Sequence, residues 1–129
     1  MIKDIYLLVG GEATRLRPLS EGIPKALLTI KGKLLIDLIL ENLVKSNIEN
    51  INLICSIKHE NFWLEYKKNS VFNVNLLFEH EKLDTAGFVV QNINNFSDKF
   101  LCMNGDLLIE MNFNSFLEVA NNSKNSTIC

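Results

Sequence analysis

A short loop near the start of the chain gathers residue types that bind phosphate. Gly10 and Gly11 directly follow an apolar run, and Arg15, Arg17 and Lys25 come shortly after them. Paired glycines let the backbone turn and expose N–H groups, which bind phosphate oxygens without help from side chains. Basic side chains add charge-assisted hydrogen bonds, roughly twice as strong as neutral ones. The loop therefore predicts a polyphosphate-binding site; the alternative is a solvated loop whose arginines face water.

Two familiar phosphate-binding motifs do not fit this loop. A P-loop closes with Gly-Lys-Ser/Thr, and the segment from Gly10 to Lys25 contains no such triplet. A dinucleotide-binding fingerprint carries further glycines after the first pair, and these are missing here. A phosphate-binding role for this segment therefore requires another class of loop.

Strand-like and helix-like segments alternate along the chain around this loop. Short apolar runs bounded by turn residues predict strands at 2–9, 51–57, 74–78 and 100–103. Apolar residues at helical spacing predict helices at 34–44, 60–68, 85–93 and 113–120. Asp84 or Thr85 is available as the N-cap of the third helix. Residues 126–129 resemble the beginning of a further strand.

The alternation predicts an α/β fold, a Rossmann-like three-layer αβα arrangement with a mostly parallel central sheet. No linker or repeat interrupts residues 1–129, so we expect them to belong to one domain. Ligands of such folds bind outside the carboxyl ends of the strands. The polar motifs at Gly10 and Asn104 follow the first and fourth predicted strands, so the fold pattern and the chemistry indicate the same site.

The composition favours an ordinary globular domain and excludes several other classes. Of 129 residues, 47% are hydrophobic and 22% are charged, and the formal net charge is -2. This balance gives no sign of a nucleic-acid or membrane-surface partner. No segment has the length and polarity of a membrane span or a secretory signal. Cys55, Cys102 and Cys129 are odd in number and widely spaced, which predicts reduced thiols and a cytoplasmic protein.

The remaining candidate residues favour structural roles. His59 and His80 have no partner at metal-ligand spacing and are expected to be structural or surface residues. Phe62, Trp63 and Tyr66 lie at or near helical spacing, which predicts core packing in preference to a stacking platform for a ring.

Three motifs resemble those of the sugar-phosphate nucleotidyltransferases, also called nucleotide-sugar pyrophosphorylases. The run GGEATRLRPLSEGIPKALLTIKGKLLI, which begins at Gly10, resembles the family pattern GGxGTRLxPLT…PKPLLPIxGKPLI. The segment from Glu81 to Gly87 resembles E-x-LGTAG, and Asn104-Gly105-Asp106 resembles the family's NGD. With three motifs in order, the resemblance extends from Met1 to about Ala120.

The resemblance implies a reaction and a role for each motif. A phosphate oxygen of a sugar 1-phosphate attacks the α-phosphorus of a nucleoside triphosphate, and pyrophosphate leaves. Arg15 and Lys25 would be catalytic, contacting the phosphates. Glu81, Thr85 and Gly87 would lie near the nucleobase or sugar; the alternative for these is a packed helix start. The triphosphate would be wrapped by residues of the opening loop, namely Gly10, Gly11, Ala13 and Thr14.

The resemblance also implies a magnesium cofactor. Asp106 would be a ligand of Mg²⁺, since a carboxylate oxygen at the end of a strand suits a metal that also binds phosphate oxygens. The alternative for Asp106 is a helix N-cap or an Asx turn.

The chain departs from the family pattern at several points. Ala13 replaces a glycine of the opening motif, and Ala26 replaces a proline. Asp84 replaces the glycine of LGTAG and places a carboxylate near an expected anion. Family catalytic domains are also longer, so we expect a domain truncated at the C-terminus, completed by a further segment or by a homo-oligomer.

Several functions remain open at this point. The DTAG form of the middle motif favours the mannose-1-phosphate guanylyltransferase-like branch, with GTP and a mannose-type hexose or heptose 1-phosphate as substrates. The alternatives are a non-catalytic nucleotide-binding or regulatory relative, and a uridylyltransferase for a glucose- or muramate-type sugar. A metal-dependent glycosyltransferase is less favoured, because Asn104-Gly105-Asp106 offers one carboxylate where those enzymes have two.

Overall fold

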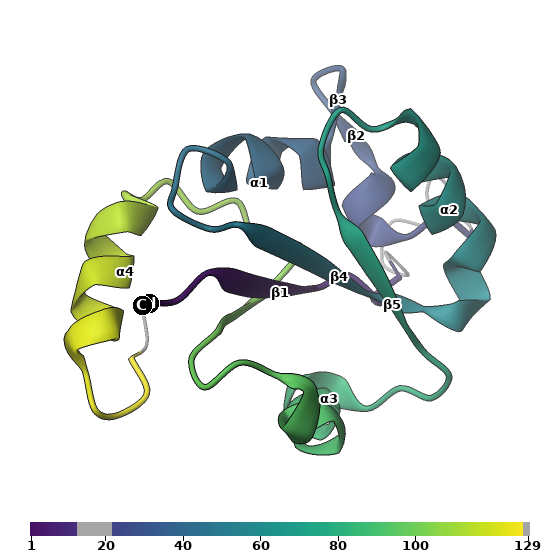
Figure 1. The fold of residues 1–129 in the computed structure, drawn as a ribbon. Helices are drawn as coiled ribbons and strands as arrows, with labels where there is room; N and C mark the ends of the chain where they lie inside the picture. Colours follow the sequence, from purple (N-terminus) through teal and green to yellow (C-terminus); the bar gives the residue numbers. More distant parts are fainter. Residues whose placement is uncertain (13–21, 128–129) are drawn as a thin grey trace.

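The centre of the molecule is a four-stranded parallel sheet, described in a computed structural model for residues 1–12 and 22–127. Its strands are β1 (Asp4–Leu8), β4 (Asn50–Ser56), β5 (Asn75–Glu79) and β6 (Leu101–Asn104). They lie in the order β5-β4-β1-β6 (Figure 1). Ile5 of β1 is in register with Ile51 of β4 and with Leu101 of β6, so β1 pairs on both edges. The predicted mostly parallel sheet is confirmed.

Helices cover both faces of this sheet, as the nearly continuous apolar strands predict. Successive side chains of β1 point to opposite faces: Ile5 and Leu7 join the core beneath α1 (Leu35–Leu43) and α2 (Glu60–Asn69). Tyr6 joins Ile54 and Phe88 in a second cluster on the face covered by α3 (Asp84–Asn92). Figure 1 shows α1 and α2 on one side of the sheet and α3 on the other. The three-layer αβα arrangement is therefore confirmed.

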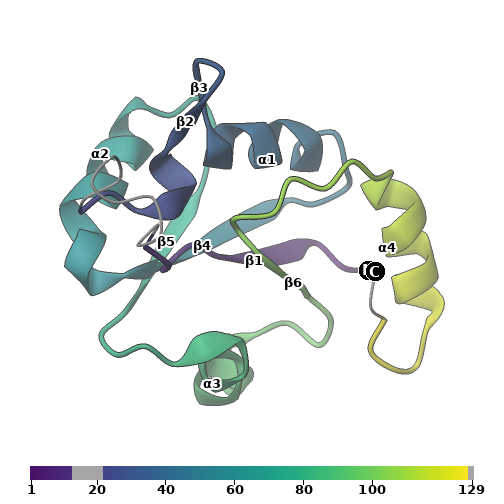
Figure 2. The same cartoon turned by 180° about the vertical axis from the view of Figure 1, so that it is seen from behind.

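The fourth helix, α4 (Phe113–Asn122), closes the end of the sheet at which β1 begins. Leu117 and Ala120 pack against Ile2, and the Ile2 backbone N–H donates to the Asn121 side chain over 2.7 Å. Seen from behind in Figure 2, β6 runs beside β1, and the amino-terminal end of the chain lies next to α4. The carboxyl ends of the strands are thus left uncovered by α4.

A small hairpin precedes α1. It pairs β2 (Thr29–Ile30) with β3 (Lys33–Leu34) around Lys31 and Gly32. Lys31 has a φ of 49° and Gly32 a φ of 82°, and positive φ at both central residues defines a type I′ turn. The described connections also include the 3-10 turns η2 (Lys25–Leu27), η3 (Ile57–His59) and η4 (Ile93–Asn95).

Three local expectations are wrong. Phe62 leaves 42% of its surface exposed, whereas Trp63 and Tyr66 are buried as expected. Neither Asp84 nor Thr85 is the N-cap of α3, because the helix already begins at Asp84 and Leu83 occupies the cap position. Residues 126 and 127 are not in a strand, and residues 128 and 129 lie outside the described residues.

No helix in the described parts of the chain is long and apolar enough to cross a bilayer.

Candidate active site at the carboxyl edge of the sheet

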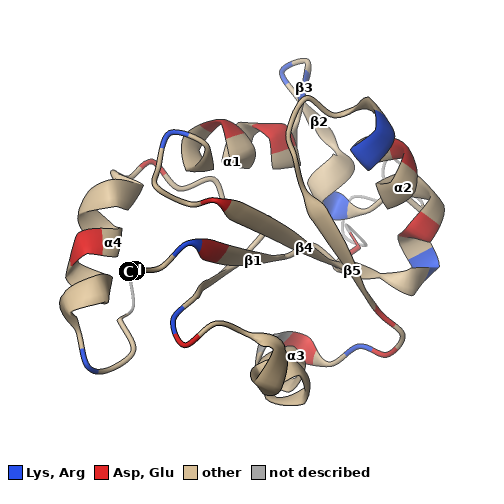
Figure 3. Ribbon diagram, viewed as in Figure 1, with Lys and Arg blue, Asp and Glu red and all other residues tan. Residues whose placement is uncertain are grey.

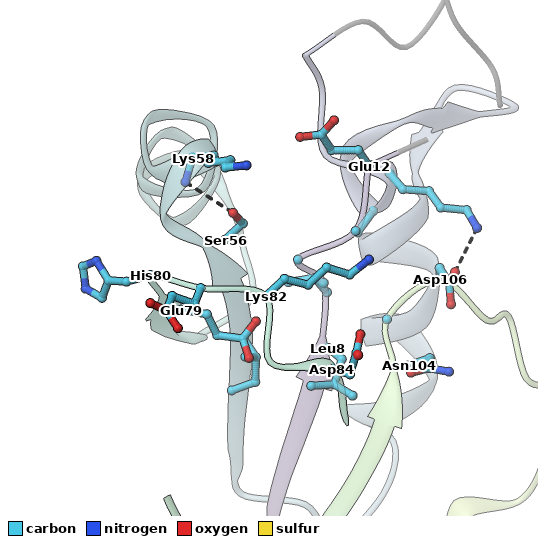
Figure 4. Close-up of a pocket in the computed structure, with 18 residues that line it drawn as sticks. Leu8, Glu12, Ser56, Lys58, Glu79, His80, Lys82, Asp84, Asn104 and Asp106 are labelled. Carbon is cyan, nitrogen blue, oxygen red and sulfur yellow. Dashed lines mark hydrogen bonds and ion pairs between the residues drawn. The ribbon is translucent and has the colours of Figure 1, made fainter. Parts of the chain in front are cut away.

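A pocket of about 570 Å³ lies where the carboxyl ends of the four parallel strands meet. Each strand contributes the segment that follows it, as expected for an open α/β sheet. Figure 4 shows Ser56, Lys58 and Glu79 on one side and Asn104 and Asp106 on the other. The pocket lining includes five residues named from the sequence, Gly10, Gly11, Lys25, Glu81 and Asp106.

Backbone hydrogen bonds hold the opening segment against the sheet. The Val9 N–H donates to the Ile54 carbonyl over 3.0 Å, which continues the strand pairing past the end of β1. The Lys25 N–H donates to the Gly11 carbonyl over 3.1 Å, and Glu12 forms an isolated antiparallel bridge with Pro24. This bridge brings Lys25 back to the glycine pair. The intervening residues, with Ala13, Thr14, Arg15 and Arg17, lie outside the described residues.

Neither a positive φ nor a steric clash in the structure requires glycine at Gly10 or Gly11. Positive φ occurs at Gly22 and Gly32 among the described glycines, and at neither Gly10 nor Gly11. A Cβ on Gly10 would lie 3.5 Å from the Ser56 backbone nitrogen, whereas a Cβ on Gly11 would meet nothing within 4 Å. Gly11 therefore leaves open space at the pocket.

Lys25 and Asp106 meet across the pocket. The Lys25 ammonium donates to Asp106 Oδ2 over 2.8 Å, and the two residues are 81 positions apart in the sequence. Both side chains remain partly exposed, at 43% and 38%. An ion pair with this much solvent contributes little to stability. Its significance is positional, because it places a cation and an anion next to each other beside Gly11.

Gly105 sets the position of Asp106. Its N–H donates to the Leu8 carbonyl over 2.9 Å, which extends the pairing of β6 with β1. A Cβ at this position would lie 2.3 Å from Val9 Cγ1 and 3.1 Å from the Leu8 carbonyl oxygen. Real Cβ atoms do not come this close, so only glycine lets the chain pass β1 at this point. Close packing against β1 therefore explains the glycine of the NGD motif.

The donors around Asp106 suit a metal shared with a substrate phosphate. Among residues 1–12 and 22–127 there is no group of three or more His, Cys, Asp or Glu that could hold a metal ion alone. Mg²⁺, however, commonly binds through one or two carboxylates, with phosphate oxygens and water completing its shell. A single solvent-accessible carboxylate facing a pocket fits this second kind of site.

Glu79, the last residue of β5, is a candidate that the sequence reasoning missed. It lines the pocket, and its Oε1 atom is buried without a hydrogen-bond partner. Burial raises the pKa of this carboxyl, and the neighbouring charge of Asp84 raises it further. The motif resemblance singled out Glu81 instead, which lines the same pocket but is exposed. The usable signal was the position of Glu79 at the carboxyl end of a strand.

Of the residues at the start of α3, Asp84 lines the pocket, whereas Gly87 packs against Leu83. Asp84 lines the pocket and has a φ of 54°, so the backbone keeps the left-handed shape that glycine favours. Gly87 is not among the pocket-lining residues, and a Cβ there would lie 3.1 Å from the Cβ of Leu83. This tight contact favours the alternative interpretation of Gly87, in which the residue serves packing at the start of the helix. The Thr85 side chain is outside the described structure.

The two histidines differ in their surroundings. His59 is 4% exposed, and its Nε2 lies 3.3 Å from Glu12 Oε1 in the opening segment. His80 is exposed, and its ring points away from the pocket in Figure 4. His59 is thus a buried residue, whereas His80 is an exposed residue of the pocket lining.

The charge of the described pocket is locally acidic. Acidic and basic residues are interspersed over the ribbon as a whole (Figure 3). The pocket lining includes three lysines, Lys25, Lys58 and Lys82, and five carboxylates, Glu12, Glu79, Glu81, Asp84 and Asp106. A polyanion bound here therefore needs additional positive charge, which a divalent cation and the arginines of the opening motif could supply.

Comparison with known proteins agrees with this geometry. The chain belongs to the Nucleotidyl transferase family, whose sequence profile matches residues 5–129. It is 36% identical over 115 residues to a putative mannose-1-phosphate guanyltransferase of Sulfolobus acidocaldarius, covering 87% of this chain and 32% of that protein. It is 34% identical over 116 residues to the bifunctional protein GlmU of Methanocaldococcus jannaschii, covering 89% and 28% of the two chains.

A solved structure shows the same fold. HddC from Yersinia pseudotuberculosis, crystallised in complex with GMP-PN, superposes with a TM-score of 0.79 at 29% identity. The match covers 94% of this chain and 55% of HddC. The chain therefore spans about a third of the length of the curated relatives and about half of this structural neighbour.

Proposed function

We propose that this chain supplies the triphosphate-binding part of a sugar-1-phosphate nucleotidylyltransferase, with GTP as the favoured nucleotide and a mannose-type sugar 1-phosphate as acceptor. The observation that carries the proposal is the meeting of Lys25 and Asp106 beside Gly11, at the carboxyl edge of the sheet. These residues provide a cation for phosphate, a carboxylate for a metal, and open backbone for close approach of a phosphate chain.

In the proposed reaction, an oxygen of the sugar 1-phosphate attacks the α-phosphorus and pyrophosphate leaves. The attacking group is already an anion, so the residues need to position and neutralise charge more than to remove a proton. Lys25 would lie between the α-phosphate and the sugar phosphate, where a compact ammonium reduces their repulsion. Arg15, from the opening motif, would contact the departing pyrophosphate. Mg²⁺ held by Asp106 would add charge neutralisation at the phosphates.

Glu79 supports a preference for guanine. An ionised carboxylate only accepts hydrogen bonds, and guanine presents an N1–H and an exocyclic amino group along one edge. Uracil presents a single N–H flanked by two carbonyl oxygens, which a carboxylate would repel. The buried, unpartnered Oε1 of Glu79 therefore suits guanine better than uracil. The named activity of the Sulfolobus relative and the GMP-PN in the HddC crystal agree with this choice.

Two measurements test the proposal. Calorimetric titration of this chain with GTP, UTP, CTP and ATP in the presence of Mg²⁺ should show GTP binding most tightly. Pyrophosphate release should then be measured with mannose 1-phosphate and other sugar 1-phosphates. The chain is used alone and fused to the C-terminal part of the Sulfolobus relative, because it spans 32% of that protein.

A matched pair of lysines provides the control. Lys25→Ala should lower turnover of the active form by far more than it weakens GTP binding, since its proposed contact is made in the transition state. Lys33→Ala removes an exposed lysine that pairs with Glu41 over 2.6 Å outside the pocket, and should change neither quantity. Equal turnover of the two variants would refute the role of Lys25. Absence of pyrophosphate release in both forms, with GTP still bound, would favour the non-catalytic nucleotide-binding alternative.

A further inference from the structure

Asp84 combines an unusual backbone with a place in the pocket. Its φ of 54° lies in the left-handed region that side-chain-bearing residues rarely adopt. Lys31 in the hairpin is the other such residue among the described non-glycine positions. Strained backbone at a pocket is a reason to ask what the side chain does, because glycine would fit the same turn without strain.

Ordinary structural roles do not account for this side chain. It supplies no capping hydrogen bond to α3, whose cap position is Leu83. Within the described residues it forms no ion pair or hydrogen bond, although Lys82 is only two positions away in the sequence. Figure 4 shows its carboxylate directed into the pocket near Leu8 and Asn104. The group therefore faces the space that a ligand would occupy.

Asp84 also lies within electrostatic reach of Glu79, since its charge contributes to the raised pKa of that carboxyl. One wall of the pocket thus presents two groups that accept hydrogen bonds and donate none when ionised. A ligand edge with several N–H groups satisfies both carboxylates, whereas an edge with a single N–H leaves one unpaired. Among the common nucleobases, guanine carries the most N–H groups on one edge, counting N1–H and its exocyclic amino group.

We propose that Asp84 is a specificity-determining residue that accepts a hydrogen bond from the exocyclic amino group of guanine, beside Glu79 at N1–H. This inference rests on the proposed function, because it assumes that the pocket binds a nucleoside triphosphate. It gives a binding function to the carboxylate of Asp84, the residue that replaces the glycine of the family's LGTAG motif.

The test uses nucleotides that differ by one group. Inosine triphosphate lacks the exocyclic amino group of GTP, and dGTP lacks the 2′-hydroxyl. The unaltered chain should bind GTP roughly tenfold more tightly than inosine triphosphate, the fold-change expected for one charge-assisted hydrogen bond. Asp84→Gly should reduce this preference to about twofold or less. The GTP to dGTP ratio should stay the same in both proteins.

A matched control distinguishes a loss of base specificity from the relief of backbone strain at a positive φ. Lys31→Gly also replaces a side chain at positive φ, but in the hairpin and outside the pocket. Both glycine variants should unfold at equal or higher urea concentration than the unaltered chain. Only Asp84→Gly should lose the preference for GTP over inosine triphosphate. Because glycine suits the turn, the decisive variant is expected to fold.

Three outcomes would overturn the inference while leaving the proposed function standing. The first is an unchanged preference for GTP over inosine triphosphate in Asp84→Gly. The second is an equal gain of affinity for every triphosphate, which would mean that Asp84 merely repels anions. The third is loss of the GTP to dGTP preference, which would assign Asp84 to the ribose. If the unaltered chain binds no nucleoside triphosphate, the proposed function itself fails, and the inference fails with it.

Discussion

The ammonium group of Lys25 and the carboxylate of Asp106 lie 2.8 Å apart, although 81 residues of sequence separate them. The pair is formed by the segment after β1 and the segment after β6, which adjacent parallel strands bring to the same edge. An Asp106→Asn substitution keeps the shape of this side chain and removes its charge. We expect it to weaken the Mg²⁺-dependent part of GTP binding by at least about tenfold, because even indirect partners of metal ligands contribute that much.

The measurement compares GTP titrations in Mg²⁺ and in EDTA. In EDTA the variant and the unaltered chain should bind GTP similarly, since no metal contact is then lost. Asp98→Asn, in an exposed loop outside the pocket, is the control. An Asp106 variant that retained its full Mg²⁺ dependence would remove this residue from the proposed metal site.

Gly105→Ala should destabilise the fold strongly. The added Cβ would lie 2.3 Å from Val9 Cγ1 and 3.1 Å from the Leu8 carbonyl oxygen, so β1 or β6 must shift. Overpacking of this kind typically costs about 1–3 kcal/mol in the free energy of unfolding. Gly11→Ala, whose Cβ would meet nothing within 4 Å, should change stability by less than about 1 kcal/mol. Urea denaturation of the two variants checks the difference.

A second substitution identifies the source of the Gly105 effect. Val9→Ala removes the Cγ1 atom that the new Cβ would meet, while the Leu8 carbonyl remains. The double variant should therefore be less unstable than the sum of the two single variants predicts. Strict additivity would show that the clash with Val9 is not the cause.

Glu79 should make stability fall as the pH rises through the mildly acidic range. Burial and then the charge of Asp84 raise its pKa in the folded protein, so the folded state keeps this proton where the unfolded chain has lost it. Between the ordinary carboxyl pKa, about 4.3, and the raised value, the folded state binds more protons, and its stability decreases with pH. Above that window, the ionised carboxylate destabilises the fold.

Glu79→Gln should consequently unfold at higher urea concentration than the unaltered chain at pH 7, with little difference near about pH 4. The same variant should bind GTP more weakly at pH 7, because an amide replaces an acceptor-only group. Glu81→Gln, which alters an exposed residue of the same pocket, should produce no comparable change in stability. A Glu79 variant that lost stability at pH 7 would contradict the assigned cause.

Tyr66 and Asp37 should stabilise the contact between α2 and α1. The Tyr66 hydroxyl donates to Asp37 Oδ1 over 2.7 Å, and Tyr66 is buried. A hydrogen bond to a charged group contributes about 1.5–3 kcal/mol, so Tyr66→Phe should lower the free energy of unfolding by about that amount. Asp37→Ala and the double variant complete a cycle in urea. Additive effects would show that the pair does not interact energetically.

The layered fold was predictable because its signals are local. The run from Ile51 to Cys55 is apolar except for Asn52 and short enough to favour a strand over a helix, and it forms the buried part of β4. Phe62 was misjudged because adjacent helical positions differ by about 100°, so the neighbour of buried Trp63 faces solvent. The two-residue strands of the hairpin are too short to show a periodicity, so the sequence did not predict them.

The candidate site was predictable to the extent that its motifs are contiguous. Gly10 and Asp106 closely follow strand ends, Lys25 begins η2, and the topology brings all three to one pocket. Whether Glu79 or Glu81 is the less exposed residue depends on which side chains of β5 face inward and on the turn at Asp84. No local sequence pattern specifies either feature. The close approach of Gly105 to Val9 likewise depends on the pairing of β1 with β6.

The central position of β1 also bears on the order in which the molecule assembles. β1 pairs with β4 on one edge and on the other with β6, which follows β4 and β5 in the sequence. Closing long loops costs entropy before any contact repays it, so parallel pairings of this kind form slowly. β4 and β5 leave the ribosome before β6, so β4 can pair with β1, and β5 with β4, before β6 is available. The wall that carries Asp106 would then join after the other three strands, so a nascent chain would form the proposed phosphate-binding segment well before the proposed metal ligand is in place.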